Sequence, residues 1–347
     1  MFEKLLRNSD GSKPKPNVGC SSIGDEKKRF DLFRSRCRIS NQGEIMDRGV
    51  RFAPSPTGRF HVGNLRTAWI SHHLSRHFQL PWIVRFEDID RPRVVQNAIE
   101  LQTRDLSSLA LRPDRVVVQS HNLERHWEVF LKAVRESQVY PCFCSRKDVR
   151  EAIQESASAR HGIEPVYSGA CRKLLNESHA MSGSAAVGWR FKMEDSSGAL
   201  DPVIARTSGL ELLAEPGSCG FVPAYHWACA IDDLDGECML LVRAWDLEHA
   251  VVFQRAVQEW LVKLERRAPG FPAIFHCSVV TGTRGERLEK RTKGVTLLEL
   301  IASGISAEAL KEKFEASFTD VLGKIEPGRI YGEMKKVITL EELGINL

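Results

Sequence analysis

The chain has 347 residues, of which 42% are hydrophobic, and this length and composition indicate a globular protein with a substantial core. No run approaches the roughly 18 consecutive apolar residues of a membrane span, so we expect a cytoplasmic protein with no membrane partner. The formal charge of +4 arises in residues 1–50, where 11 Lys+Arg face 7 Asp+Glu, which leaves 38 of each in the remaining chain. Net charge therefore neither supports nor excludes RNA, and any RNA contact needs a local basic face.

Residues 1–49 are polar and show no sustained hydrophobic period. They contain a Lys-Pro-Lys-Pro run at 13–16 and a charged cluster at 25–29. Such a composition is typical of a disordered or accessory arm. Met46 stands just before the first strand-like run, which raises the hypothesis that natural translation starts there.

Residues 50–139 alternate between strand and helix patterns. A short strand at 50–53 meets a rigid turn of prolines and glycine at 54–58, and a helix is expected from about 63 to 78. Further patterns then follow along the chain: a strand at 82–86, a helix at 98–111, a strand at 116–118 and a helix at 123–134. This alternation predicts the first half of a doubly wound α/β domain with a mostly parallel sheet.

Residues 140–225 interrupt the alternation with clustered Cys, Gly, Ser and Pro, and they are predicted to form an inserted module. Strand and helix patterns return at 239–243, 248–264 and 273–276, so residues 226–298 are expected to complete the sheet. Residues 299–347 are expected to form a short helical segment.

The proline-rich turn at 54–58 is followed by His61, Gly63 and Asn64, which lie at the start of the expected helix. Free backbone N–H groups and the helix dipole attract phosphate at such a point, and a residue without a side chain permits close approach. A histidine that caps the helix or fills the core is the better reading of His61 when the motif is taken alone.

The run at 51–64 resembles the HIGH-motif region of glutamyl-type class I aminoacyl-tRNA synthetases, and 85–90 resembles the second signature of that family. Residues 287–291 resemble the mobile KMSKS loop, although Glu289 departs from the usual small residue and a solvated basic loop is the alternative. The resemblance implies a Rossmann-like class I catalytic domain, ATP accompanied by Mg²⁺, and catalytic roles for His61 and Lys290. It assigns ATP binding to His61, Gly63, Asn64 and Lys290.

The same resemblance implies L-glutamate as the amino-acid substrate. An arginine can hold a carboxylate through two charge-assisted hydrogen bonds, and Glu87 can receive the substrate ammonium. A structural ion pair between Glu87 and Arg243 is the alternative, and His226 and Ala244 depart from the family pattern. The glutamate-binding set that the resemblance implies is Arg51, Phe52, Ala53, Pro54, Ser55, Glu87, Tyr225 and Arg243.

Nine cysteines in a cytosolic chain are expected to be reduced, buried or metal-bound. Cys142 and Cys144, followed by Tyr167 and Cys171, resemble the structural zinc site of glutamyl-Q tRNA(Asp) synthetases. A Cys₃His site using His161, or simple buried thiols, remain as alternatives. Cys219, Cys229 and Cys238 are expected to be core residues.

The resemblance runs from about residue 51 to about 298, and an anticodon-binding domain is not expected in the residues that follow. The glutamyl-Q family is therefore the nearest match, which implies transfer of glutamate to queuosine in the anticodon of tRNA(Asp). We expect a monomer. Two other functions remain open: a truncated glutamyl-tRNA synthetase that charges tRNA(Glu), and a non-catalytic synthetase paralogue. A different nucleotidyltransferase would have no reason for Glu87, Tyr225 and Arg243.

Overall fold

The structure is a computed structural model. It describes residues 48–144, 167, 169–174, 187–194, 200–210, 212, 217, 219–268, 270–283, 285–286, 288, 295–318 and 326–345. All of them belong to one unit that spans Asp47–Leu347. The predicted arm at 1–49 lies almost entirely outside the described residues.

A six-stranded parallel sheet forms the centre of this unit. Its strand order is β11-β9-β8-β1-β2-β3, so β1 lies between the strand that follows it in the chain and the strand that enters after the interruption. All five residues of β2 are buried, as expected for an inner strand of a parallel sheet, whereas β3 is partly exposed at the edge. The strands are β1 Val50–Phe52, β2 Trp82–Phe86, β3 Arg115–Val118, β8 Leu240–Ala244, β9 Ala273–Cys277 and β11 Ile330–Gly332.

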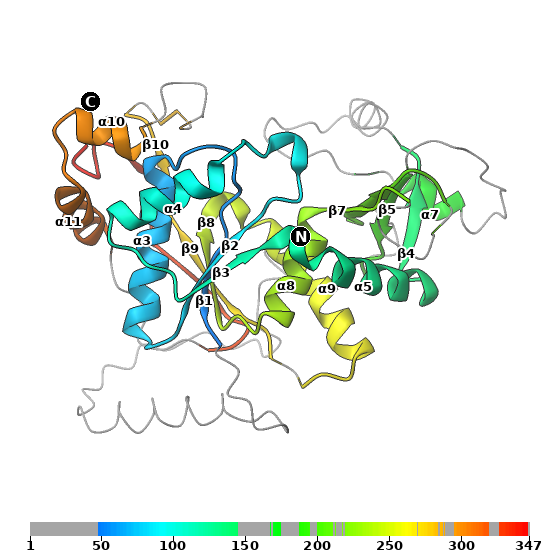
Figure 1. Ribbon diagram of the computed structural model, residues 1–347. Coiled ribbons are helices and arrows are strands. Elements are labelled where there is room, and N and C mark those ends of the chain that lie inside the picture. The colour runs from blue at the N-terminus through cyan, green and yellow to red at the C-terminus, as the bar shows by residue number, and fades with distance from the viewer. Residues whose placement is uncertain are drawn as a thin grey trace, which may run out of the picture. The chain divides into compact units, whose positions relative to one another are not determined.

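Helices cover both faces of this sheet. Helices α3 and α4 lie on one side and α8 and α9 on the other (Figure 1), as the right-handed crossovers of a doubly wound fold require. The α-helices are α3 Val62–His77, α4 Ala98–Ser108, α5 Leu123–Arg135, α7 Ala170–Leu174, α8 Tyr225–Asp235, α9 Ala250–Leu264, α10 Leu297–Ala302 and α11 Ala307–Ser317. The 3₁₀ turns are η1 Arg91–Arg93, η2 Gln119–Asn122 and η4 Trp245–Leu247.

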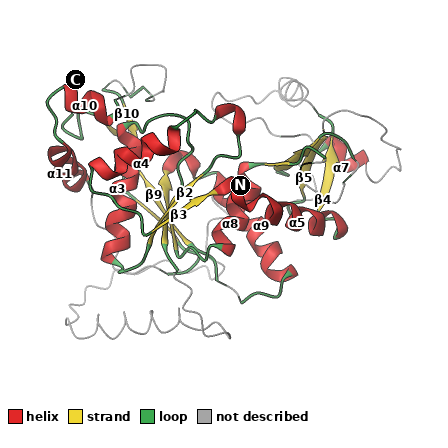
Figure 2. Cartoon of the chain, viewed as in Figure 1, coloured by secondary structure: helices red, strands yellow, loops and turns green. Residues whose placement is uncertain are grey.

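A second, antiparallel sheet stands apart from the parallel one in Figure 2. Its strands are β4 Val139–Cys142, β5 Val187–Phe191, β6 Val203–Thr207 and β7 Val222–Pro223. These strands fall almost wholly within the stretch where the sequence predicts an inserted module. The exact domain boundaries stay a prediction.

The two larger hydrophobic clusters lie at the six-stranded and the four-stranded sheet. One lies around α3 and the parallel strands and includes Leu65, Ile70 and Trp82. The other joins α5, α8 and α9 to the antiparallel sheet, where Phe130 and Trp189 meet edge to face at 5.2 Å. The antiparallel sheet is thus attached to the domain through shared apolar packing, not only through the chain.

The prediction of a helical segment at 299–347 is incomplete. Besides α10 and α11, this part contains β11, which becomes the edge strand beside β9, and β12 Val337–Thr339, which pairs in parallel with β10 Val279–Thr281. Their partners lie more than fifty residues earlier in the chain. Three-residue strands carry no periodic signal of their own, and only the exposed edges of β9 and β10 make them strands.

The predicted fold class is confirmed at the level of an α/β domain with a parallel central sheet. Among the described residues, no helix is long and apolar enough to cross a membrane.

Candidate active site

A cleft of about 730 Å³ opens at the carboxyl ends of β1, β2 and β8. The strand order reverses at β1, and ligands of open parallel sheets bind at such a switch point. The cleft brings together most of the residues predicted to bind ATP or glutamate. Those that line it are Phe52, Ala53, Pro54, Ser55, His61, Gly63, Asn64, Glu87, Tyr225 and Arg243.

The proline-rich turn after β1 is held from below by α4. Gln102, which is 1% exposed, donates to the carbonyl oxygens of Ser55 at 3.1 Å and Gly58 at 2.8 Å. The buried carboxylate of Asp105 accepts from the Arg59 side chain and from the backbone N–H of Phe60. These bonds satisfy backbone groups of the turn and fix it against α4.

His61 is the N-cap of α3. Its Nδ1 accepts from the backbone N–H of Gly63 at 3.1 Å, so the neutral ring carries its proton on Nε2. A Cβ at position 63 would lie 3.0 Å from the ring of His61 and 3.3 Å from Val280, which explains the glycine. The capping role expected of the motif when it is taken alone is therefore present, and His61 also lines the cleft.

Glu87 extends from the end of β2 into the cleft. Its Oε1 accepts from Nη2 of Arg85 at 3.0 Å and from Sγ of Cys229 at 3.0 Å. Its backbone N–H donates to the carbonyl of Pro54 at 2.9 Å, which ties it to the turn after β1. The predicted structural pair between Glu87 and Arg243 is not among these contacts.

Arg51 is buried beside the cleft wall, at 3% exposure, with its charge already matched. Nε and Nη2 donate to the two oxygens of Asp233 at 3.1 and 2.8 Å. Arg85 also donates to Asp233, at 2.6 Å, and to Glu87. Two arginines and two carboxylates therefore form one buried, charge-balanced network, and Arg51 is absent from the lining of the cleft.

Arg243 differs from Arg51 in its place at the cleft and in its partners. It lines the cleft from the end of β8 and is 4% exposed, and its Nη1 donates to Oε1 of Gln254 at 2.7 Å. Nε and Nη2 are buried and have no hydrogen-bond partner among the described residues. They are the same two nitrogens with which Arg51 holds Asp233. We call Nε and Nη2 the fork of the guanidinium. Burying a fork without a hydrogen-bond partner is costly unless an anion binds to it.

Helix α8 supplies partners that the sequence did not single out. Cys229, predicted as a core residue, is indeed buried, but it also contacts Glu87; Asp233 holds Arg51 and Arg85. Asp232 accepts from Gln119 at 2.7 Å and from His126 at 2.8 Å. Two adjacent aspartates directly after the apolar run at 227–231 were the available signal, because such residues are rarely buried without partners.

Lys290 lies outside the described residues, as do Arg287, Glu289 and Arg291. The ends of their loop are placed: β10 leads into it from the cleft wall, and Leu288 lines the cleft. After the loop, the carbonyl of Val295 accepts from the backbone N–H of Val62 at 2.8 Å, and Thr296 bridges to His61. The loop therefore starts and ends beside the N-terminus of α3.

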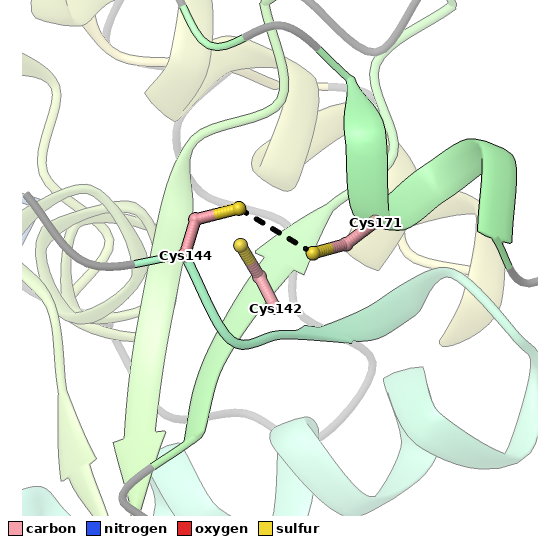
Figure 3. A group of neighbouring side chains, drawn as sticks. All are labelled: Cys142, Cys144 and Cys171. Atoms are coloured by element: carbon pink, nitrogen blue, oxygen red, sulfur yellow. Dashed lines mark hydrogen bonds between the residues drawn. The ribbon is translucent and has the colours of Figure 1, made fainter. Parts of the chain in front are cut away.

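The three cysteines of the predicted metal site lie together at the antiparallel sheet. Cys142 ends β4, Cys144 follows it, Cys171 comes from α7, and their thiols point toward one another (Figure 3). All three Sγ atoms lie within 4.8 Å, with Cys144 and Cys171 at 3.6 Å. Zn–S bonds of about 2.3 Å require sulfur atoms about 3.8 Å apart, so this donor set fits a zinc ion.

Tyr167 reaches the same cluster. Its Oη lies 3.8 Å from Sγ of Cys142 and accepts from the backbone N–H of Cys171 at 2.7 Å. The guanidinium of Arg190 stacks on its ring at 3.6 Å and donates to Cys142 at 3.2 Å. A hydrogen bond from Cys142, which outweighs burial, lowers the pKa of Cys171 to about 6. His161, the alternative fourth ligand, lies outside the described residues.

Proteins with similar sequences identify the family of this chain. Residues 49–309 match the family of class I tRNA synthetases (E and Q), catalytic domain. The chain is 37% identical over 248 residues to a glutamyl-Q tRNA(Asp) synthetase of Deinococcus radiodurans, which covers 70% of this chain and 79% of that protein. A protein of the same name in Cutibacterium acnes is 35% identical over 266 residues, 74% of this chain and 71% of its own.

Glutamate–tRNA ligase 1 of Cereibacter sphaeroides is 30% identical over 312 residues, which is 85% of this chain but only 65% of the relative's length. Among solved structures, a glutamate tRNA ligase from Elizabethkingia meningosepticum superimposes with a TM-score of 0.54 at 19% identity, over 87% of this chain and 64% of that one, and this shows a shared fold. The resemblance read from the sequence motifs is thus confirmed, and the chain belongs to the family of class I tRNA synthetases (E and Q).

Proposed function

We propose that the chain activates L-glutamate with ATP, forming glutamyl-adenylate and pyrophosphate, and then transfers the glutamyl group to queuosine in the anticodon of tRNA(Asp). The observation that carries the first step is the unpaired fork of Arg243, buried in the same cleft as Glu87 and the N-terminus of α3. One wall can hold a carboxylate, another an ammonium group and a third a phosphate.

The amino-acid subsite follows from which charges are already matched. Both fork nitrogens of Arg51 donate to Asp233, so Arg51 supports the cleft wall. Arg85 donates to the same aspartate and is held in place through it. Arg243 keeps its fork for a carboxylate of glutamate, while Gln254 orients the guanidinium from behind. Glu87 receives the substrate ammonium, and Tyr225 lines the cleft beside them. Glutamine would lose the ionic part of the Arg243 contact.

The ATP subsite uses the turn and the start of α3. The positive end of the α3 dipole favours phosphate, and His61, Gly63 and Asn64 line the cleft at that end. Lys290 is proposed to reach the phosphates because Val295 and Thr296, which follow its loop, pair with Val62 and His61. Mg²⁺, when bound with ATP, supplies further charge neutralisation on the phosphate oxygens.

Activation is then a displacement at phosphorus. An oxygen of the substrate α-carboxylate attacks the α-phosphorus, the bond to the bridging oxygen breaks, and pyrophosphate leaves with that electron pair. The Nε2 proton of His61 and the ammonium of Lys290 stabilise the negative charge that develops on the phosphate oxygens, without a protein nucleophile. A hydroxyl of the acceptor next attacks the mixed anhydride and releases AMP.

Queuosine is proposed as the acceptor because the chain covers more of the two relatives named glutamyl-Q tRNA(Asp) synthetase than of the glutamate–tRNA ligase. Charging of tRNA(Glu) is the second candidate, since the glutamate–tRNA ligase relatives match over more of this chain. The two candidate functions differ in the tRNA that accepts the glutamyl group, so an experiment can distinguish them directly.

The deciding experiment is glutamate-dependent ATP–pyrophosphate exchange by the purified chain, alone and with each tRNA. The proposal expects exchange without tRNA, and labelled glutamate attached to tRNA(Asp) that carries queuosine but not to the same tRNA with guanosine in its place. Exchange that requires tRNA(Glu), with glutamate on its 3′ end, would select the second candidate. No exchange by a folded, metal-loaded protein would leave a non-catalytic paralogue.

Lys290→Ala tests the loop. Loss of one charged phosphate contact removes about 1.5–3 kcal/mol of transition-state stabilisation or more, so the exchange rate should fall at least about tenfold to a hundredfold. Lys293→Ala, a lysine of the same loop, is the control and should retain the rate. Normal turnover of Lys290→Ala would remove this residue from the mechanism.

We also propose that Cys142, Cys144, Cys171 and Tyr167 hold a structural zinc ion that fastens α7 to the antiparallel sheet. Cys171→Ser should lose the bound zinc, measured by metal analysis of the purified protein. Cys277→Ser, which alters a buried thiol of β9, is the control and should keep it. Tyr167→Phe separates a phenolate ligand from a packing role: unchanged zinc content would assign only three protein ligands.

A further inference from the structure

One face of α8 organises the cleft from behind. Tyr225, Ala228, Cys229, Asp232 and Asp233 occupy positions i, i+3, i+4, i+7 and i+8, which share a face of a helix. The first two line the cleft. The last three are buried and contact side chains of other elements that either line the cleft or support one that does.

Within this face, Cys229 contacts Glu87, a side chain that lines the cleft. Its side chain is 1% exposed, and its Sγ lies 3.0 Å from Oε1 of Glu87. Arg85 donates to the same oxygen at 3.0 Å. Oε2 of Glu87 makes no hydrogen bond among the described residues, while Glu87 itself lines the cleft.

The thiol acts as a donor in this contact. Burial, reinforced by the negative charge of Glu87, raises the pKa of Cys229 well above its usual range, so the sulfur keeps its proton. A carboxylate accepts and cannot donate, which fixes the direction of the hydrogen bond from S–H to Oε1. Two donors on Oε1 restrict the rotation of the carboxyl group and leave Oε2 as the oxygen without a donor among the described residues.

We propose that Cys229 is a positioning residue of the amino-acid subsite: together with Arg85 it orients Glu87 so that Oε2 receives the ammonium group of the substrate. This inference rests on the proposed activation of glutamate. A cysteine that merely filled the core would need no donor at this point. The two explanations therefore differ in what replaces the thiol without loss.

Three variants separate them. Cys229→Ala removes the donor at small cost in volume, and Cys229→Ser restores a donor of similar size. Cys238→Ala is the matched control, because Cys238 is also buried but packs with Leu241, Val251 and Ile274. Thermal unfolding of all four proteins shows that each variant is folded before its kinetics are compared.

The experiment measures the KM of glutamate and of ATP in pyrophosphate exchange, and the affinity for L-glutamate and for glutarate, its analogue without the amino group, by calorimetry. In Cys229→Ala the KM and Kd of glutamate should rise about three- to tenfold, as expected for loss of one weak hydrogen bond to a charged group. The KM of ATP and the affinity for glutarate should stay within about twofold, and Cys229→Ser and Cys238→Ala should match the parent chain.

Equal losses for glutamate and glutarate, or a serine variant as impaired as the alanine variant, would overturn the positioning role. So would an alanine variant that binds glutamate as tightly as the parent. If the parent chain itself neither binds glutamate nor catalyses exchange, the proposed function fails first and the inference with it.

Discussion

Two arginines in this cleft look alike in the sequence and differ in their partners. Arg51 lies within the strand pattern at 50–53 and Arg243 ends the pattern at 239–243, and family resemblance assigns both to glutamate. The fork of Arg51 is occupied by Asp233, whereas the fork of Arg243 has no partner among the described residues. A guanidinium already bound through both fork nitrogens cannot grip a second carboxylate in the same way, so the two positions should respond differently to substitution.

Arg243→Lys keeps the positive charge but removes the fork. We expect the KM of glutamate to rise about tenfold to a hundredfold, corresponding to about 1.5–3 kcal/mol, because the lysine forms a single point contact. The KM of ATP should change by less than about twofold. Exchange kinetics with each substrate varied in turn provide the measurement.

Arg104→Lys is the control for that substitution, since Arg104 forms an exposed pair with Glu100 on α4. Its KM values should equal those of the parent chain. A KM of glutamate unchanged in Arg243→Lys would return the carboxylate to Arg51 or to another group.

At the level of elements, an ion network joins the ends of α5, α8 and α9. Glu265 follows α9 and accepts from Arg125 and Lys132 of α5 and from Arg267. Arg125 also donates to Asp235 at the end of α8, at 2.8 Å. Burial disfavours the charged form of Glu265, but hydrogen bonds from Arg125, Lys132 and Arg267 outweigh it and lower the pKa to about 2.

This depressed pKa predicts a pH-dependent contribution to stability. The stabilisation is fully present above the unfolded-state pKa of about 4.3 and is lost as the pH falls toward 2. Glu265→Gln should therefore lower the free energy of unfolding by about 1–2 kcal/mol at pH 7, and by much less near pH 2.5. Urea unfolding of both proteins across this range gives the difference.

Glu308→Gln, at an exposed position of α11, should show almost no difference at any pH. A gap between Glu265→Gln and the parent chain that does not shrink on acidification would show that the network stabilises through packing and not through charge.

At the scale of the whole molecule, the C-terminal part is joined to the cleft through a buried ion pair. Glu333, just after β11, accepts from both terminal nitrogens of Arg66 on α3, at 2.7 and 2.6 Å. It also accepts from the backbone N–H of Ser278, a residue of the cleft lining, at 2.7 Å. Glu333 lies beyond residue 309, where the match to the family ends.

Glu333→Gln should lower the free energy of unfolding by about 3–5 kcal/mol, because Arg66 is 1% exposed and would keep an unmatched charge. Where the variant remains folded, the KM of ATP should rise more than the KM of glutamate, since Ser278 leads into β10 and the loop of Lys290. Chemical unfolding and exchange kinetics test the two parts separately.

Glu342→Gln is the matched control, because Glu342 pairs with Lys335 at the surface, where such pairs contribute at most about 1 kcal/mol. Equal stability of Glu333→Gln and Glu342→Gln would mean that the ion pair of Glu333 contributes no more to the free energy of unfolding than a surface pair does.

Periodic and local features of this protein could be read from the sequence alone. The alternation of buried strands and amphipathic helices predicts the parallel sheet, because each pattern repeats over several residues. The turn and helix start at His61 and Gly63 are equally local, since a cap and a close backbone approach involve residues two apart. The cysteine cluster was also foreseen as a group, through its resemblance to a known spacing.

What the sequence could not decide is which charges neutralise one another. Asp233 binds Arg51, which is 182 residues away in the sequence, and Glu87 contacts Cys229, which is 142 residues away. Strand β11 pairs with β9 only when the sheet already has an open edge. Such pairings carry no period and no local propensity, and they exist because folding brings buried polar groups together that must then be satisfied. The sequence by itself determined the family, the sheet and the residue types of the cleft; tertiary structure decided that Arg243, and not Arg51, keeps an unpaired fork.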